Sequence, residues 1–223
     1  MNVKLFFEAL LKFLLGIILI GLLIFIPANT IRYWNGWLFM GLLFIPMFVA
    51  SIVMMIKVPN LLKSRLDAKE KESEQKSVVA LSGLMFLAGF IMAGLDYRFN
   101  WIQLPDIIVI IASIIFLLSY ILYAEVLREN IFLSRTIEVQ KDQKVIDTGL
   151  YGIVRHPMYF ATIFLFLSMP LILGSFIAFI IFLVYPFIIV KRIKNEEQVL
   201  EKELEGYKEY KKKVKYKMIP FVW

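Results

Sequence analysis

The stretch MYFATIFLFLSMPLILGSFIAFIIFLVYPFIIV, residues 158–190, decides how the membrane part of this chain is arranged. It carries no charged side chain and is much longer than the roughly 20 apolar residues that cross a bilayer. Pro170 and Gly174 lie near its middle, where a helix is expected to break. We therefore predict two short helices that form a hairpin and turn at residues 170–175.

Apolar tracts also precede this hairpin. They occupy residues 13–28, 37–56, 78–95 and 107–126, and the first can begin earlier on an amphipathic turn that carries Glu8 and Lys12. Hydrophobic residues make up 60% of the chain and charged residues 19%, which is more apolar than a typical soluble domain. The sequence thus predicts an all-α polytopic membrane protein with about six transmembrane helices.

The placement of Lys and Arg supports an even number of crossings. Under this topology the outer loops hold only Arg32 and Arg98, and every other basic residue falls in the N-terminus, residues 57–77, residues 127–157 or the tail. This is the positive-inside pattern, with both termini cytoplasmic. Five crossings would place the basic tail outside. The net charge of +7 then needs no nucleic-acid partner and indicates attraction to anionic lipids.

The absence of cysteine excludes a disulfide, a thiolate nucleophile and a cysteine-based metal site; we expect no metal. No small-residue cleavage site follows the first apolar tract, so we expect it to remain as a membrane span. The Lys- and Ile-rich composition without cysteine is typical of a prokaryotic protein, which indicates a multi-pass protein of the inner (cell) membrane.

The polar chemistry lies in the second half. Residues 1–126 consist of apolar tracts and a mixed-charge loop at 57–77, so we predict a four-helix transmembrane scaffold there and a catalytic half at 127–223. The connector ENIFLSRTIEVQKDQKVIDTGLYGIVRHPMY, residues 129–159, shows strand-like alternation at 136–139 and a turn at Thr148–Gly149. Such long connectors are usually functional or disordered, and the Ile, Val and Tyr content favours an ordered cytoplasmic lobe.

The single histidine, His156, stands between Arg155 and Pro157 at the edge of the hairpin. Proline suits the first turn of a helix, so the free amides of residues 158–160 are expected to face the lobe. Together with Arg155 and His156 they would form an anion receptor at membrane level. On this triplet alone, an interfacial arginine before a helix-starting proline is the better interpretation.

The tail IVKRIKNEEQVLEKELEGYKEYKKKV, residues 189–214, predicts an amphipathic C-terminal helix. Its apolar stripe comprises Ile193, Leu200, Leu204 and Tyr207. Glu197 falls on that stripe, with Glu196 beside it and Arg192 four residues before Glu196, within reach on one helix face. Ionisable groups beside a membrane helix end are candidates for function, whereas the more distal glutamates fit a solvated face.

These segments resemble the isoprenylcysteine carboxyl methyltransferase family, a group of integral membrane methyltransferases that includes phospholipid methyltransferase relatives. The shared features are G-x-Y-x-x-x-R-H-P-x-Y, an apolar hairpin, E-E and an aromatic-rich Y-x-x-Y, over about residues 130–214. Two departures are Leu150, where bacterial relatives commonly have proline, and residues 204–206, where relatives usually have an aromatic residue and a glycine and the chain is one residue shorter.

The resemblance implies S-adenosyl-L-methionine as methyl donor, bound in a cytoplasmic pocket between the connector and the last helix. The cofactor-contacting set would be Gln140, Gln143, Lys144, Val145, Ile146, Tyr151, His156, Pro157, Tyr159 and Glu196. Arg192 falls where the family places an arginine that orients the substrate. The donor's carboxylate also suits Arg155 with His156, and Glu197 or His156 could act as a base.

Alternatives remain for the function. The acceptor is expected to be lipid-like or a small hydrophobic molecule, a prenylcysteine-type carboxylate among them, that arrives from the bilayer. A phospholipid amine or a small thiol is the alternative, and an amine would need a base. A non-enzymatic membrane protein that binds a partner or headgroup is another hypothesis. A reductase with a nicotinamide cofactor is a fourth, although no glycine-rich dinucleotide fingerprint is present.

Overall fold

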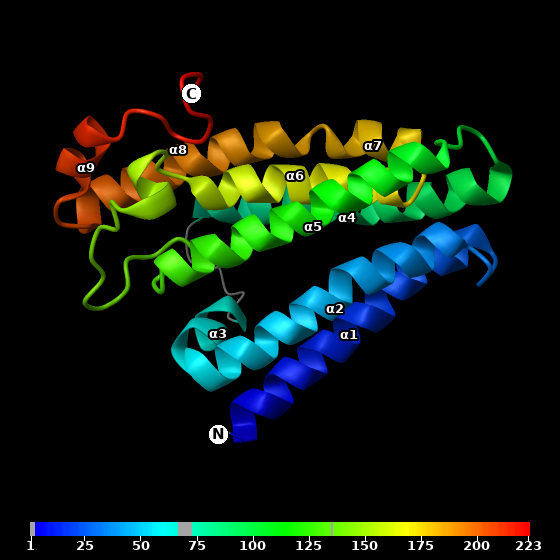
Figure 1. Cartoon of the computed structure of the whole chain (residues 1–223), viewed down its shortest axis with the longest axis horizontal. Coiled ribbons are helices and arrows are strands. Elements are labelled where there is room, and N and C mark those ends of the chain that lie inside the picture. The colour runs from blue at the N-terminus through cyan, green and yellow to red at the C-terminus, as the bar shows by residue number, and fades with distance from the viewer. Residues whose placement is uncertain (1–2, 67–72, 135) are drawn as a thin grey trace.

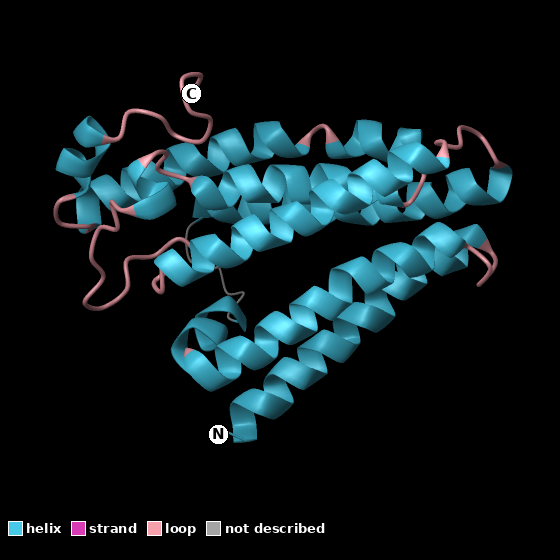
Figure 2. Cartoon of the chain, viewed as in Figure 1, coloured by secondary structure: helices cyan, strands magenta, loops and turns pink. Residues whose placement is uncertain are grey.

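The structure, a computed structural model, describes residues 3–66, 73–134 and 136–223, and within them the chain is entirely helical apart from its loops (Figures 1 and 2). Nine α-helices and one 3₁₀-helix lie in these residues. They are α1 (Val3–Ala28), α2 (Trp34–Lys57), α3 (Pro59–Leu66), α4 (Ser73–Phe99), α5 (Asp106–Glu129), η1 (Gly149–Gly152), α6 (Pro157–Ile172), α7 (Phe176–Phe182), α8 (Tyr185–Glu203) and α9 (Tyr207–Lys213).

The chain is a multi-pass integral membrane protein. Five helical segments of the described chain are long and apolar enough to cross a bilayer, the last being α7 and α8 taken together as Phe176–Glu203. The apolar helix α6 is shorter but runs beside α5 and α8. The predicted all-α fold is confirmed: α1, α2, α4 and α5 contain the tracts at 13–28, 37–56, 78–95 and 107–126, and the tract at 158–190 is divided among α6, α7 and the start of α8.

The predicted hairpin turns where the sequence places it. Helix α6 ends at Ile172, and Gly174 adopts a positive φ of 73°, which a residue with a side chain rarely takes. Ser175 then caps α7, because its hydroxyl accepts a hydrogen bond from the Ala178 amide at 3.1 Å. The same hydroxyl donates to the buried carboxylate of Asp96 at 2.5 Å. The turn is therefore fastened to the end of α4.

The helices share one hydrophobic core. Its buried members come from α1, α2 and α4 as well as from the hairpin and α8. Helices α1 and α4 are in close contact at Gly94, where an added Cβ would lie 2.5 Å from the Ile24 carbonyl oxygen and 3.0 Å from the Ala28 nitrogen. Small residues permit such backbone contact between membrane helices. The N-terminal helices are thus packed directly against the rest of the bundle.

Two polar segments differ from their predictions. Part of the predicted loop at 57–77 forms helix α3, on which Leu61 and Leu62 are buried. Residues 67–72 lie outside the described residues. The predicted strand at 136–139 is not formed: the described residues of the connector are irregular up to η1. The tail helix breaks after Glu203 and resumes as α9.

Both ends of the chain and the connector lie toward the same end of the bundle (Figure 1). Figure 2 shows the longest loops gathered at that end, around η1, α8 and α9. The fold brings described residues of the connector together there with residues of α8 and α9. This end therefore holds most of the polar side chains that the sequence singled out.

Candidate active site

A cavity opens among the connector, the start of α6, α8 and α9. Its residues enclose about 810 Å³ of non-atom space, open mouth included. The lining residues are Asn130, Phe132, Leu133, Ser134, Thr136, Ile137, Glu138, Gln143, Lys144, Val145, Ile146, Tyr151, Arg155, His156, Met158, Tyr159, Arg192, Glu196, Leu200, Leu204, Tyr207 and Tyr210.

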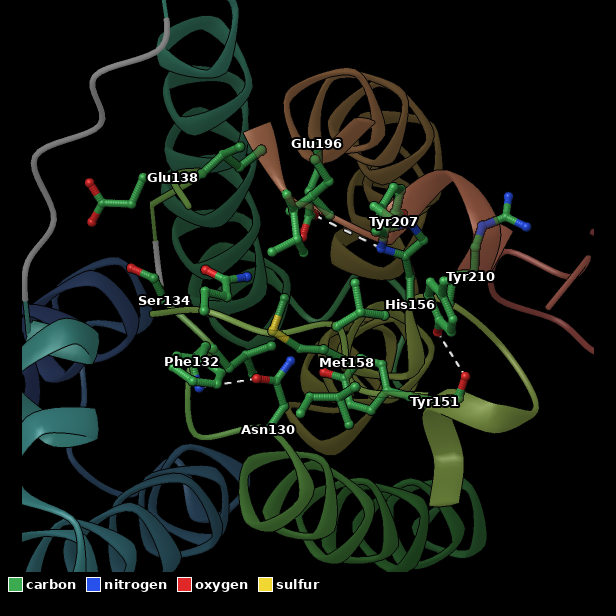
Figure 3. Close-up of a pocket in the computed structure, with 18 of the residues that line it drawn as sticks. Asn130, Phe132, Ser134, Glu138, Tyr151, His156, Met158, Glu196, Tyr207 and Tyr210 are labelled. Atoms are coloured by element: carbon green, nitrogen blue, oxygen red, sulfur yellow. Dashed lines mark hydrogen bonds and ion pairs between the residues drawn. The ribbon is translucent and has the colours of Figure 1, made fainter. Parts of the chain in front are cut away.

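Most of the predicted site residues come together in this cavity. Figure 3 shows His156, Met158 and Glu196 around a common space, with Tyr151 and Tyr210 beside them. The predicted residues that line it are Gln143, Lys144, Val145, Ile146, Tyr151, Arg155, His156, Tyr159, Arg192 and Glu196. Three others, Gln140, Pro157 and Glu197, are absent from the lining.

Gln140 shapes the connector. Its side-chain Nε2 donates to the Phe132 carbonyl at 2.6 Å, and its backbone amide donates to the Gln143 side chain at 2.8 Å. The turn that follows depends on Gly149, where a Cβ would collide with the Glu129 carboxylate. That carboxylate accepts from the Leu150 amide at 2.9 Å. Glu129 was not predicted, because only the folded connector brings it against the turn.

A relay of hydrogen bonds joins the α8 side chains to α6. The Tyr159 hydroxyl donates to Glu196 at 2.6 Å, and Arg192 Nε donates to that hydroxyl at 2.9 Å. Arg192 Nη1 also reaches the side-chain oxygen of the buried Gln75, on α4, at 3.4 Å. Tyr159 therefore couples the carboxylate to the arginine, and Arg192 lies on the side of the cavity nearest α4.

A second group of charges lies deeper. Glu197 is 4% exposed and accepts from Arg155 Nε at 2.8 Å and from His156 Nε2 at 3.2 Å. The ammonium groups of Lys217 and Lys211 approach it at 3.5 and 3.8 Å. Several partners thus offset the burial of this carboxylate, and removal of one partner from a buried pair is strongly destabilising.

Two of the backbone amides at the start of α6 already donate hydrogen bonds within the protein. Tyr159 and Phe160 N–H groups donate to the His156 carbonyl at 3.2 and 3.4 Å, so the anion receptor predicted from three free amides is reduced. Arg155 also directs Nη1 to the carbonyl oxygens of Val214 and Lys215 at 2.7 and 2.8 Å. Its guanidinium is therefore engaged mainly by protein groups.

Two tyrosines of the lining carry buried hydroxyls without a hydrogen-bond partner in the described structure, Tyr151 and Tyr207. The two residues are only 7% and 4% exposed. Burial raises the pKa of Tyr207 above its ordinary value of 10.0, so its hydroxyl stays protonated. Buried polar groups normally have partners, and these hydroxyls are positioned to gain one from a ligand.

Sequence reasoning missed much of the rest of the lining. The missed residues of the connector enter the cavity through its fold and carry no motif of their own; they are Asn130, Phe132, Leu133, Ser134, Thr136, Ile137 and Glu138. Tyr207 and Tyr210 form the Y-x-x-Y of the tail, which was recognised as a shared feature without a role. Their three-residue spacing on α9 presents both to the same side, and this was the one signal that could have identified them.

The comparisons agree with the resemblance. Residues 107–202 match the Isoprenylcysteine carboxyl methyltransferase (ICMT) family. The chain is also 31% identical over 91 residues to Delta(14)-sterol reductase TM7SF2 of Mus musculus. That alignment covers 40% of this chain and 22% of the reductase, so the chain spans about a fifth of the curated relative that it matches. The family match includes the connector with His156, and Glu196 and Glu197 of α8.

Proposed function

We propose that this membrane protein, whose residues 107–202 match the isoprenylcysteine carboxyl methyltransferase family, is a methyltransferase that uses S-adenosyl-L-methionine. Its acceptor would be lipid-like or a small hydrophobic molecule. The observation that carries the proposal is the convergence of His156, Tyr159 and Glu196 with two unpaired tyrosine hydroxyls around one cavity. Those groups come from segments far apart in the sequence, so the cavity forms only when the connector, α6, α8 and α9 are folded together.

The chemistry of the lining supports such a donor. The molecule carries hydroxyls, a carboxylate, an adenine ring and a cationic sulfonium, and the lining offers the carboxylates of Glu138 and Glu196, one imidazole and several aromatic rings. Glu196 would accept from hydroxyls or face the cationic end, and Tyr151 and Tyr207 would donate to acceptor atoms or stack. When bound, the donor supplies a methyl group that is transferred by in-line displacement from sulfur, without a metal.

The charges behind the lining would position His156. Because Glu197 accepts at His156 Nε2, the imidazole presents Nδ1 toward Glu196, whose carboxylate lies 4.0 Å away. Arg155 would support the same arrangement through Glu197 and the backbone, as a positioning residue. Alignment and exclusion of water are the main contributions that this reaction needs from a protein.

Arg192 would hold the acceptor. It lies beside α4, and its guanidinium could pair with a carboxylate on an acceptor that enters from the bilayer. A prenylcysteine-type carboxylate or a thiolate needs no base. A phospholipid amine would need one, and of the two candidates from the sequence only His156 lines the cavity.

Calorimetric titration of S-adenosylmethionine and S-adenosylhomocysteine into the detergent-purified chain tests the proposal. His156→Ala and Glu196→Ala should each weaken binding by about tenfold or more, as expected for loss of a charge-assisted hydrogen bond. Lys208→Ala is the matched control, since Lys208 is exposed on α9 outside the lining. A well-folded wild-type protein that binds neither compound would remove the methyltransferase proposal.

A reductase is the second candidate, and the match to a sterol reductase is the observation that favours it. The same titration with a reduced nicotinamide dinucleotide separates the two. Binding of the dinucleotide, lost in His156→Ala, together with no response to S-adenosylmethionine would establish the reductase. If neither ligand binds, the remaining hypothesis is a non-enzymatic membrane protein whose polar lobe binds a partner or headgroup.

A further inference from the structure

The last residues of the chain form a strap, residues 214–223, that holds the backbone at the start of α6. The Arg155 amide donates to the Tyr216 carbonyl at 3.0 Å, and the His156 amide donates to the Lys217 carbonyl at 2.7 Å. These two residues directly precede Pro157, where the apolar helix α6 begins. The strap therefore lies at the level where the chain enters the membrane.

The end of the strap closes on itself. The amides of Met218 and Ile219 donate to the Trp223 carbonyl at 2.9 and 3.0 Å, and the Trp223 amide donates to the Ile219 carbonyl at 3.0 Å. Met218 is buried in the main core, and Trp223 packs on it. The Lys217 ammonium lies 5.1 Å from the centre of the Trp223 ring. Residues 218–223 thus form an ordered loop, fixed at both ends.

This loop presents large apolar side chains outward. Phe221 is 86% exposed and Val222 is 76% exposed. Phe221 also has a φ of 64°, a left-handed conformation that an aromatic residue rarely adopts. In water the exposure of two large apolar side chains would be unfavourable. A neighbouring apolar environment accounts for it.

We propose that residues 218–223 dock into the interface of the lipid bilayer. Phe221 and Val222 would lie between headgroups and acyl chains, with Trp223 in the aromatic belt and the exposed Lys215 among anionic headgroups. The bilayer is favoured over a protein partner because the loop is hydrogen-bonded to the residues from which α6 enters the membrane. The inference goes beyond methyl transfer: the bilayer itself would hold the strap that fixes the backbone of Arg155 and His156.

The chain contains no cysteine, so a single introduced cysteine can be labelled specifically. Val222→Cys, coupled to a fluorophore, is reconstituted in vesicles of phosphatidylcholine and phosphatidylglycerol. Lipids with a nitroxide at the headgroup boundary should quench the label strongly, while aqueous iodide should quench it weakly. Lys212→Cys on the exposed side of α9 is the control and should show the reverse. A Val222 label that iodide reaches as readily as the control would overturn the proposal and leave a protein partner as the occupant.

The coupling to the site is tested by hydrogen exchange in lipid nanodiscs. Phe221→Asp should speed exchange of the Arg155 and His156 amides, whereas Phe221→Leu should leave it unchanged. Aspartate tolerates a positive φ better than phenylalanine, so relief of backbone strain would act in the opposite direction. Unchanged exchange in Phe221→Asp would refute the coupling. No cofactor is added in either measurement, so these outcomes do not depend on the methyltransferase proposal.

Discussion

At the scale of single residues, two tyrosines of α9 differ in how their hydroxyls are used. Tyr210 donates to the Tyr151 carbonyl at 2.7 Å, whereas the Tyr207 hydroxyl has no partner within the described structure. Both rings are buried in the same small cluster. The cavity wall therefore contains one hydroxyl that serves the fold and one that is available to a ligand.

We expect opposite effects from removing these hydroxyls. Tyr207→Phe should keep or raise the free energy of unfolding by about 1 kcal/mol, because a buried unpaired hydroxyl is lost, and should weaken donor binding about fivefold. Tyr210→Phe should lower the free energy of unfolding by about 1 kcal/mol. Denaturant titrations without ligand and calorimetry with it measure both. Loss of stability in Tyr207→Phe would mean that its hydroxyl has a structural partner.

Burial also predicts how these tyrosines titrate. Because burial favours the neutral phenol, the raised pKa of Tyr207 delays its ionisation beyond the ordinary value of 10.0. A raised pKa gives stability that is full below pH 10.0 and declines as the pH rises above it. Ultraviolet titration of tyrosinate should therefore be the same in wild type and Tyr207→Phe up to pH 10.0. A smaller early phase in the variant would contradict this prediction.

The sequence singled out side chains of the candidate site more readily than the hydrogen bonds between them. His156 stands at a helix start and Glu196 stands beside the apolar stripe that carries Glu197, whereas Tyr159 came from the family resemblance. The engagement of Arg155 with the carbonyls of Val214 and Lys215 could not be predicted, because a backbone carbonyl leaves no trace in residue type. The role of Glu129 could not be predicted either, because only the folded connector brings it against the turn.

At the scale of elements, the packing of α1 on α4 depends on a missing side chain. Gly94→Ala would push a methyl group onto the backbone of α1, which cannot move without opening the core. We expect the free energy of unfolding to fall by about 1–3 kcal/mol, as in overpacked cores. Denaturant titration in mixed micelles measures it.

Gly83 supplies the control for this change. It lies on the same helix, and nothing is within 4 Å of an added Cβ. Gly83→Ala should keep the stability or raise it by up to about 1 kcal/mol, because alanine favours the helix. Equal losses in the two variants would show that the contact at Gly94 has no particular role.

The hairpin of α6 and α7 was predictable and the shape of the connector was not. An apolar run too long for one crossing, with Pro170 and Gly174 in its middle, has few other solutions in a bilayer. The connector has no such constraint. Its path is set by contacts with residues distant in the sequence, such as the hydrogen bond that Arg65 on α3 donates to the Ser134 carbonyl at 3.1 Å. Helix α3 was not predicted, because charged residues surround its two buried leucines in the sequence.

At the scale of the whole molecule, the charges predict an orientation. Both termini and the cavity lie toward one end of the bundle, and Arg32 lies in the turn between α1 and α2, toward the other (Figure 1). In intact cells a membrane-impermeant thiol reagent should label Arg32→Cys and should not label Lys4→Cys or Lys212→Cys until the membrane is opened. The reverse pattern would place the cavity outside the cell.

The strap across Arg155 and His156 has a consequence for biosynthesis. The carbonyl of Lys217 cannot receive the His156 amide until the ribosome has translated residue 217 and released it from the exit tunnel. By then α6, α7 and α8 have already been passed to the insertion machinery. The cavity is therefore finished last, and a nascent chain interrupted before the strap would be inserted in the membrane without a completed site.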